Sequence, residues 1–109
     1  MQVLVTGATG FVGRALIPML QKAGHDVAAA VRNDTSLAYL GSVRTHNIGD
    51  IGPATDWQEA LTGVDAVIHL AGRAHVMAET DKDPLASYRH INRDGTRQLA
   101  KASADAGVK

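Results

Sequence analysis

The stretch Gln2-Val-Leu-Val-Thr-Gly-Ala-Thr-Gly-Phe-Val-Gly13 decides the fold of this chain. Its first five residues, Gln2–Thr6, form a short aliphatic and β-branched run that is typical of a buried strand. From Phe11 to Ala23, apolar residues recur every three or four positions, which predicts a helix that ends before Gly24. The stretch is therefore expected to form a strand, a glycine-rich turn and a helix.

The turn itself has the spacing G-x-x-G-x-x-G. Gly7 suits a tight turn out of the strand, Gly10 leaves room for a pyrophosphate, and Gly13 allows the helix to lie close to the sheet. The helix N-terminus that follows offers N–H groups and a positive dipole end to an anion. We interpret the turn as a nucleotide site; the alternative is an ordinary strand–helix turn that contains glycines by chance.

Further strands and helices alternate along the chain. Such alternation predicts an α/β fold, a doubly wound parallel sheet with helices on both faces and right-handed crossovers. The apolar patterns predict strands at Asp26–Val31, Val43–Ile48 and Asp65–Ala71, a helical turn at Ser36–Leu40, a short helix at Asp56–Thr62 with Asp56 as N-cap, and a long helix at Pro84–Ala106.

Composition excludes several classes of protein. The 109 residues suffice for one small domain, and the formal net charge of zero gives no reason to expect nucleic acid or an anionic membrane as partner. The chain has no cysteine, so disulfides and thiolate metal sites are excluded and a cytoplasmic location is expected. No apolar run is long enough to span a membrane, and no histidines and carboxylates occur at metal-ligand spacing.

The segment Val5–Gly13 resembles the signature of extended short-chain dehydrogenases/reductases, the NAD-dependent epimerase/dehydratase group that acts on nucleotide sugars. Gly49-Asp-Ile51, Ile68-His-Leu-Ala-Gly72 and Ile91-Asn-Arg-Asp-Gly-Thr96 are similar to three further motifs of that family, at matching spacing. The resemblance implies a Rossmann-type sheet of order 3-2-1-4, truncated after about four strands. Residues 1–109 are then an N-terminal NAD(P)-binding half-domain.

The resemblance also implies roles within the site. Asp50 would accept a hydrogen bond from the adenine amino group and Ile51 would pack on the ring; the alternative is that Asp50 only closes a loop. Asn92 would support the site, its alternative being a polar residue on a solvated helix face. The candidate cofactor-binding residues are Gly7, Thr9, Gly10, Phe11, Val12, Arg32, Asp50, Ile51, Leu70, Ala71, Gly72 and Asn92.

The end of the second predicted strand bears on the choice of cofactor. NAD-specific proteins carry an acid there that binds the ribose hydroxyls, whereas Val31-Arg32 occupies that place here. An arginine can bind a 2′-phosphate through its planar fork of donors, so NADP is favoured over NAD. Alternatively, Arg32 is a solvated loop charge and Asp34 reaches the ribose.

The family's chemistry requires a Tyr-x-x-x-Lys pair, in which the tyrosine is the acid/base group. Tyr39 is followed four positions later by Val43, and Tyr88 by Asn92, so the pair is absent from these 109 residues. We therefore expect a catalytically incomplete portion of a nucleotide-sugar epimerase, dehydratase or 4-keto reductase, with its substrate domain elsewhere. The alternative is an NADP-responsive regulatory module.

The resemblance has one more implication, which is a homodimer. The predicted helix Pro84–Ala106 corresponds to half of the family's usual two-helix dimer contact. The strand Asp65–Ala71 would also be an uncovered edge of a four-stranded sheet, and such edges favour pairing with another chain. Self-association is expected.

Overall fold

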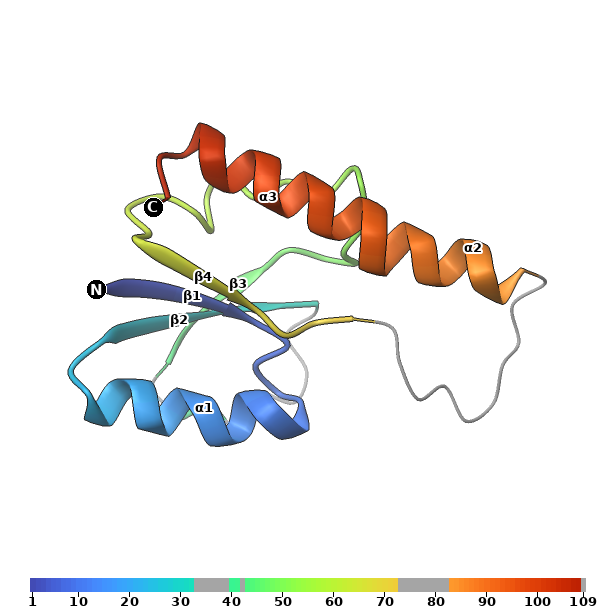
Figure 1. The fold of residues 1–109 in the computed structure, drawn as a ribbon. Coiled ribbons are helices and arrows are strands. Elements are labelled where there is room, and N and C mark those ends of the chain that lie inside the picture. Colours follow the sequence, from blue (N-terminus) through green and yellow to red (C-terminus); the bar gives the residue numbers. More distant parts are fainter. Residues whose placement is uncertain (33–39, 42, 73–82, 109) are drawn as a thin grey trace.

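The computed structural model describes residues 1–32, 40–41, 43–72 and 83–108 (Figure 1). Within this part of the chain, the strands form one parallel sheet in the order β3-β2-β1-β4. The predicted α/β fold and strand order are therefore confirmed, while most of Ser36–Leu40 and the alternative ribose ligand Asp34 lie outside the described residues. The strands are β1 (Gln2–Thr6), β2 (Asp26–Val31), β3 (Arg44–Asn47) and β4 (Ala66–His69).

Helices cover both faces of the sheet (Figure 1). Helix α1 (Phe11–Lys22) lies on one face, and a continuous helical run lies on the other: α2 (Pro84–Tyr88), the π-helical segment η2 (Arg89–Gly95) and α3 (Thr96–Asp105). Within this described part, no helix is both long and apolar enough to cross a membrane.

The two-residue period of β1 divides its side chains between two hydrophobic cores. Val3 and Val5 belong to the core that includes Ile17 of α1. Leu4 belongs to the opposite core, which includes Leu99 of α3. Burial on both faces makes β1 the central strand, and it pairs with β2 on one side and β4 on the other.

The predicted short helix Asp56–Thr62 is wrong, because the segment forms consecutive turns. The Leu61 N–H donates to the Trp57 carbonyl in a helical manner, at 3.0 Å, but the Thr62 N–H returns only to the Glu59 carbonyl, at 3.3 Å. Asp56 Oδ1 does accept the Gln58 N–H, at 3.0 Å. A segment this short does not sustain a helix on its own, and the burial of Trp57 and Leu61 fixes its path instead.

The long helix predicted over Pro84–Ala106 exists, but it is not a regular α-helix. Its middle, η2, is π-helical, and such segments concentrate at functional sites. A local and a tertiary feature accompany the change. Within the run, the Thr96 hydroxyl donates to the Asn92 carbonyl four residues earlier, at 2.8 Å. Gly95 faces the cleft loop so closely that a Cβ there would lie 2.8 Å from Ile51 Cγ2, a contact that helical periodicity does not predict.

Candidate functional site

A cleft of about 980 Å³ lies where the strands of the sheet end at their carboxyl termini. Its walls come from the β1–α1 turn, the end of β2, the loop after β3 and the end of β4, with two residues of η2 closing one side. In doubly wound α/β sheets, ligands bind at this edge, where the connections on either side of the central strand leave in opposite directions. The strand order therefore places the cleft between β1, β2 and β4.

The glycine turn forms the floor of this cleft. Gly7 has φ +68°, and a Cβ added there would lie 2.7 Å from the main-chain nitrogen of Ala71. A Cβ added at Gly13 would lie 2.7 Å from the carbonyl oxygen of Ala8. Helix α1 therefore lies closer to the turn than a residue with a Cβ at position 13 would allow. Both neighbours are backbone atoms, which have no room to give way. Glycine is thus required at both positions.

The N-terminus of α1 points its N–H groups at the same place. Its N-cap is Gly10, with no side-chain cap and no acidic residue in the first turn. The Arg14 side chain turns back, and its Nε donates to the Thr9 carbonyl at 2.9 Å. A helix end of this kind has partial positive charge and N–H donors without an intrahelical acceptor, so its chemistry suits a phosphate oxygen.

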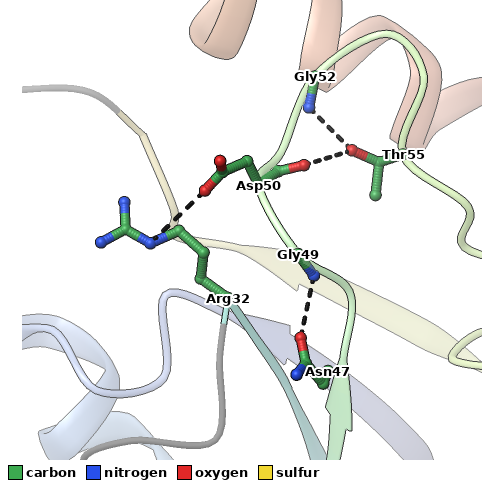
Figure 2. A network of polar contacts seen from close by, with 6 residues as sticks. All are labelled: Arg32, Asn47, Gly49, Asp50, Gly52 and Thr55. Atoms are coloured by element: carbon green, nitrogen blue, oxygen red, sulfur yellow. Dashed lines mark hydrogen bonds and ion pairs between the residues drawn. The ribbon is translucent and has the colours of Figure 1, made fainter.

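The loop after β3 is held in shape by its own hydrogen bonds (Figure 2). The buried Thr55 hydroxyl accepts the Gly52 N–H and donates to the Asp50 carbonyl, each at 2.9 Å, and Asn47 Oδ1 accepts the Gly49 N–H at 3.1 Å. The main chain of Asp50, rather than its carboxylate, therefore closes the loop. The carboxylate is left pointing into the cleft entrance.

That carboxylate reaches the end of β2. Asp50 Oδ1 lies 3.7 Å from Arg32 Nε, and the two side chains are 90% and 75% exposed (Figure 2). The pair joins two walls of the cleft at its open side. Because both groups are well hydrated, the interaction is weak and either group is available to a ligand.

Nine of the twelve predicted cofactor-binding residues line the cleft, and three do not. The side chains of Phe11 and Val12 are 94% and 57% exposed and lie outside it. Asn92 lies just behind it, since its Oδ1 would be 3.2 Å from a Cβ at Gly72. The nine are Gly7, Thr9, Gly10, Arg32, Asp50, Ile51, Leu70, Ala71 and Gly72.

Sequence reasoning missed part of the lining. Ring atoms of His90 lie so close to the loop that a Cβ at Gly52 would be 2.8 Å from His90 Nε2. The only signal in the sequence was that His90 and Ile91 precede Asn92. The other residues missed are Ala8, Ala30, Val31, Ile48, Gly52, Ala54, Thr55 and Asp56.

A hydrogen-bonded histidine lies behind the cleft wall. The side chain of His69, the last residue of β4, is half-buried between the hydroxyls of Thr6 and Thr96, at 2.6 Å and 3.2 Å. Burial lowers the pKa of His69 from its ordinary value of 6.5. Among residues 1–32, 40–41, 43–72 and 83–108, no three histidine or carboxylate side chains gather as metal ligands.

The strand order, the glycine turn between β1 and α1, and the cleft at the carboxyl ends define a Rossmann-type α/β domain. A family model described as the NAD dependent epimerase/dehydratase family matches residues 3–109. The chain belongs to this family, which confirms the resemblance seen in its motifs.

Individual relatives agree with this assignment. The chain is 40% identical over 112 residues to a UDP-glucose 4-epimerase of Vibrio cholerae, and 33% identical over 110 residues to a 3-beta-hydroxysteroid dehydrogenase of Mycolicibacterium neoaurum. The alignments cover 98% and 99% of this chain but only 32% and 30% of those proteins. The chain thus spans about a third of the length of these curated relatives.

A solved structure, MoeE5 in complex with UDP-glucose and NAD, superposes on this fold with a TM-score of 0.77. The two sequences are 32% identical, and the match covers 99% of this chain and 34% of MoeE5. The structural similarity to MoeE5 therefore extends over the sheet and the cleft of this chain.

Proposed function

We propose that this chain binds NAD(P) as the cofactor-binding portion of a longer epimerase, dehydratase or reductase. The observation that carries the proposal is the cleft floor, where Gly7 and Gly10 line the cleft without side chains and the uncapped end of α1 faces the same space. The residues present fit a dinucleotide, because a pyrophosphate needs close backbone approach and N–H donors at one point.

Each wall of the cleft then has a role. The turn residues Thr9 and Gly10, with the main-chain N–H groups of Phe11 and Val12, would hold the pyrophosphate. Asp50 and Ile51 would hold the adenine on the far side, through the carboxylate and the apolar side chain.

The end of β4 completes the site. Leu70, Ala71 and Gly72 would lie along the cofactor, with Asn92 supporting Gly72 from behind. When bound, the cofactor supplies a hydride acceptor or donor, and this chain supplies the binding and the orientation.

Arg32 favours NADP over NAD. Its guanidinium stands at the cleft entrance, 75% exposed, and lies close to the exposed carboxylate of Asp50. A 2′-phosphate offers several oxygen acceptors and more charge than one carboxylate, so it would displace Asp50 from Arg32.

For the longer protein we propose a nucleotide sugar as substrate, in an epimerase, dehydratase or 4-keto reductase reaction. The names of the Vibrio cholerae relative and of the MoeE5 complex support this choice. The absence of Tyr-x-x-x-Lys from these 109 residues leads us to propose that they bind cofactor without turning over substrate. Conversion of UDP-glucose by the full-length protein tests the substrate class, and turnover of a steroid alone would contradict it.

Cofactor binding is tested by isothermal titration of the chain with NAD and with NADP. Thr9→Asp places a negative charge against the proposed pyrophosphate, and we expect affinity for both cofactors to fall by about tenfold or more. An acid beside a helix N-terminus stabilises the helix, so loss of affinity would not reflect unfolding. Gln21→Glu adds the same charge near the other end of α1 and should change neither affinity.

Saturable binding that Thr9→Asp weakens supports the proposal. Absence of binding by the unmodified chain, or equal affinity in Thr9→Asp, would overturn it.

A further inference from the structure

The direction of the hydrogen bonds around His69 can be worked out from Thr6. The Thr6 side chain is fully buried, and its Oγ1 accepts the N–H groups of Leu70 and Ala71, each at 3.1 Å. A hydroxyl has one proton to donate and two lone pairs. Both N–H groups only donate, although the Leu70 N–H is shared with the Thr6 carbonyl at 3.2 Å. With these donors directed at its lone pairs, the Thr6 O–H donates to His69 Nδ1 at 2.6 Å. Nδ1 is therefore unprotonated, and the neutral ring carries its proton on Nε2.

The hydrogen bonds of Thr96 independently place the ring proton on Nε2. The Thr96 hydroxyl donates its proton to the Asn92 carbonyl, at 2.8 Å, so it can only accept a hydrogen bond from His69. The Nε2–H of His69 supplies that proton across 3.2 Å. The donors thus run in one direction, from Thr6 through His69 and Thr96 to the main chain of Asn92.

This chain of hydrogen bonds connects segments that border the cleft. Thr6 precedes the glycine turn, His69 precedes the cleft-lining Leu70–Gly72, and Thr96 fixes the carbonyl of Asn92, whose side chain lies against Gly72. His69 itself does not line the cleft. Its effect on a ligand must therefore pass through the segments it joins.

We propose that His69 is a positioning residue, whose neutral Nε2–H ring aligns the end of β4 and the Asn92 segment of η2 for the cofactor, and whose protonation releases them. The proposal rests on cofactor binding at this cleft. A second proton would sit on Nδ1 and face the Thr6 hydroxyl, both of whose lone pairs are already used. Thr6 would have to lose its hydrogen bond to His69 or that to one of the two N–H groups, of which Leu70 would keep the Thr6 carbonyl at 3.2 Å and Ala71 would lose this acceptor.

The surroundings of the ring favour the neutral form. Its side-chain partners from β1 and from the start of α3 are both uncharged threonines. On the adjoining η2 segment, the charged Arg93 and Asp94 pair with each other at 2.8 Å, and burial is the cause of the lowered pKa of His69.

Two measurements on the whole chain test the proposal. The first is the ring ¹⁵N spectrum near neutral pH, in which the His69 signals are identified by their loss in His69→Asn. We expect an unprotonated Nδ1 and a protonated Nε2. A ring protonated on Nδ1, or on both nitrogens, at neutral pH would overturn the proposal without any reference to the cofactor.

The second measurement is NAD affinity between about pH 8 and about pH 5, the range in which a histidine titrates. NAD is used because its pyrophosphate does not titrate in this range, whereas the 2′-phosphate of NADP does. We expect affinity to fall as the His69 ¹⁵N signals report protonation. In His69→Asn, an amide oxygen can still accept from Thr6 but cannot titrate, so affinity should stay within about threefold of the unmodified chain and the His69 step should vanish.

His69→Leu keeps neither hydrogen bond, and its affinity should fall by about tenfold. His46→Asn, a change on β3 outside the cleft, should preserve the pH step. A step that persists in His69→Asn would overturn the positioning role while leaving cofactor binding intact. Absence of NAD binding at every pH would instead contradict the proposed function, and the ¹⁵N result would still decide the state of the ring.

Discussion

Arg32 Nε and Asp50 Oδ1 approach to 3.7 Å across the entrance of the cleft and join the end of β2 to the loop after β3. Both side chains are exposed, so the pair contributes at most about 1 kcal/mol to stability. The pair is important because it brings together two groups from two walls of the proposed cofactor site: a cation suited to a 2′-phosphate and an acceptor suited to adenine.

Replacement of Arg32 by alanine tests the cofactor preference. We expect NADP affinity to fall by about tenfold or more, because a charge-assisted bond to phosphate is lost, while NAD affinity changes by less than about threefold. Isothermal titration with both cofactors measures the two effects. Arg44→Ala removes the same charge from β3, where the side chain bonds Gln2 instead, and should alter neither. Equal NAD and NADP affinities before and after Arg32→Ala would refute the preference.

The glycine turn offers a matched pair of substitutions. Gly7 and Gly49 both have φ +68°, but a Cβ at Gly7 would meet the backbone of Leu70 and Ala71 just after β4, whereas a Cβ at Gly49 meets nothing within 4 Å. Gly49→Ala should cost about 1–2 kcal/mol of unfolding free energy from backbone strain alone. Gly7→Ala adds a clash with the backbone of Ala71 and should cost about 4 kcal/mol or more. Urea unfolding measures the unfolding free energy of both variants. Equal decreases would show that the close approach of Gly7 to the backbone of Leu70 and Ala71 is unimportant.

Thr55 is expected to set the shape of the loop that carries Asp50, on the side of the cleft where we propose that adenine binds. Thr55→Val removes a hydroxyl that both accepts from Gly52 and donates to Asp50, which should lower the unfolding free energy by about 1–3 kcal/mol. Cofactor affinity should fall as well, because the loop that carries Asp50 loses its closure. Thr55→Ser retains the hydroxyl and should restore both quantities. If Thr55→Val binds cofactor as tightly as Thr55→Ser, the loop does not depend on this closure.

The lowered pKa of His69 predicts how stability depends on pH. The folded chain holds this ring neutral to a lower pH than the unfolded chain, whose histidine has the ordinary pKa of 6.5. Below that value the unfolded chain binds more protons. The unfolding free energy should therefore decline as pH falls from 6.5 through the folded pKa, with its full value present above 6.5.

Urea midpoints across this range should show that decline. His69→Asn should lack the contribution of this group, so its curve should be flatter than that of the unmodified chain. Parallel curves for the two proteins would mean that another group is responsible.

Much of the fold and of the candidate site could be predicted because their signals are local. The apolar runs indicated each strand, and the resemblance of the motifs to a known family indicated the order of the strands in the sheet. The glycine spacing located the β1–α1 turn, and the ends of β2 and β4 supplied Arg32 and Leu70–Gly72. Parallel strands bring their carboxyl ends to one edge, so residues at those ends were expected to meet.

What the sequence could not supply depends on contacts between distant segments. The proton direction through His69 follows from hydroxyls of Thr6 and Thr96, which belong to separate elements. The same holds for the approach of His90 to Gly52 and for the contact of Gly95 with Ile51 beside the π-helical segment.

The sequence by itself therefore determined the strands and the glycine turn, because periodicity and backbone requirements act within a few residues, while the strand order and much of the site came from the resemblance of its motifs to a known family. Only the tertiary structure decided that Asp50 faces Arg32, that Asp56–Thr62 forms turns, and that His69 is fixed in one tautomer. In each of these cases the deciding partner lies far away along the chain, or the burial of side chains outweighs a weak local preference.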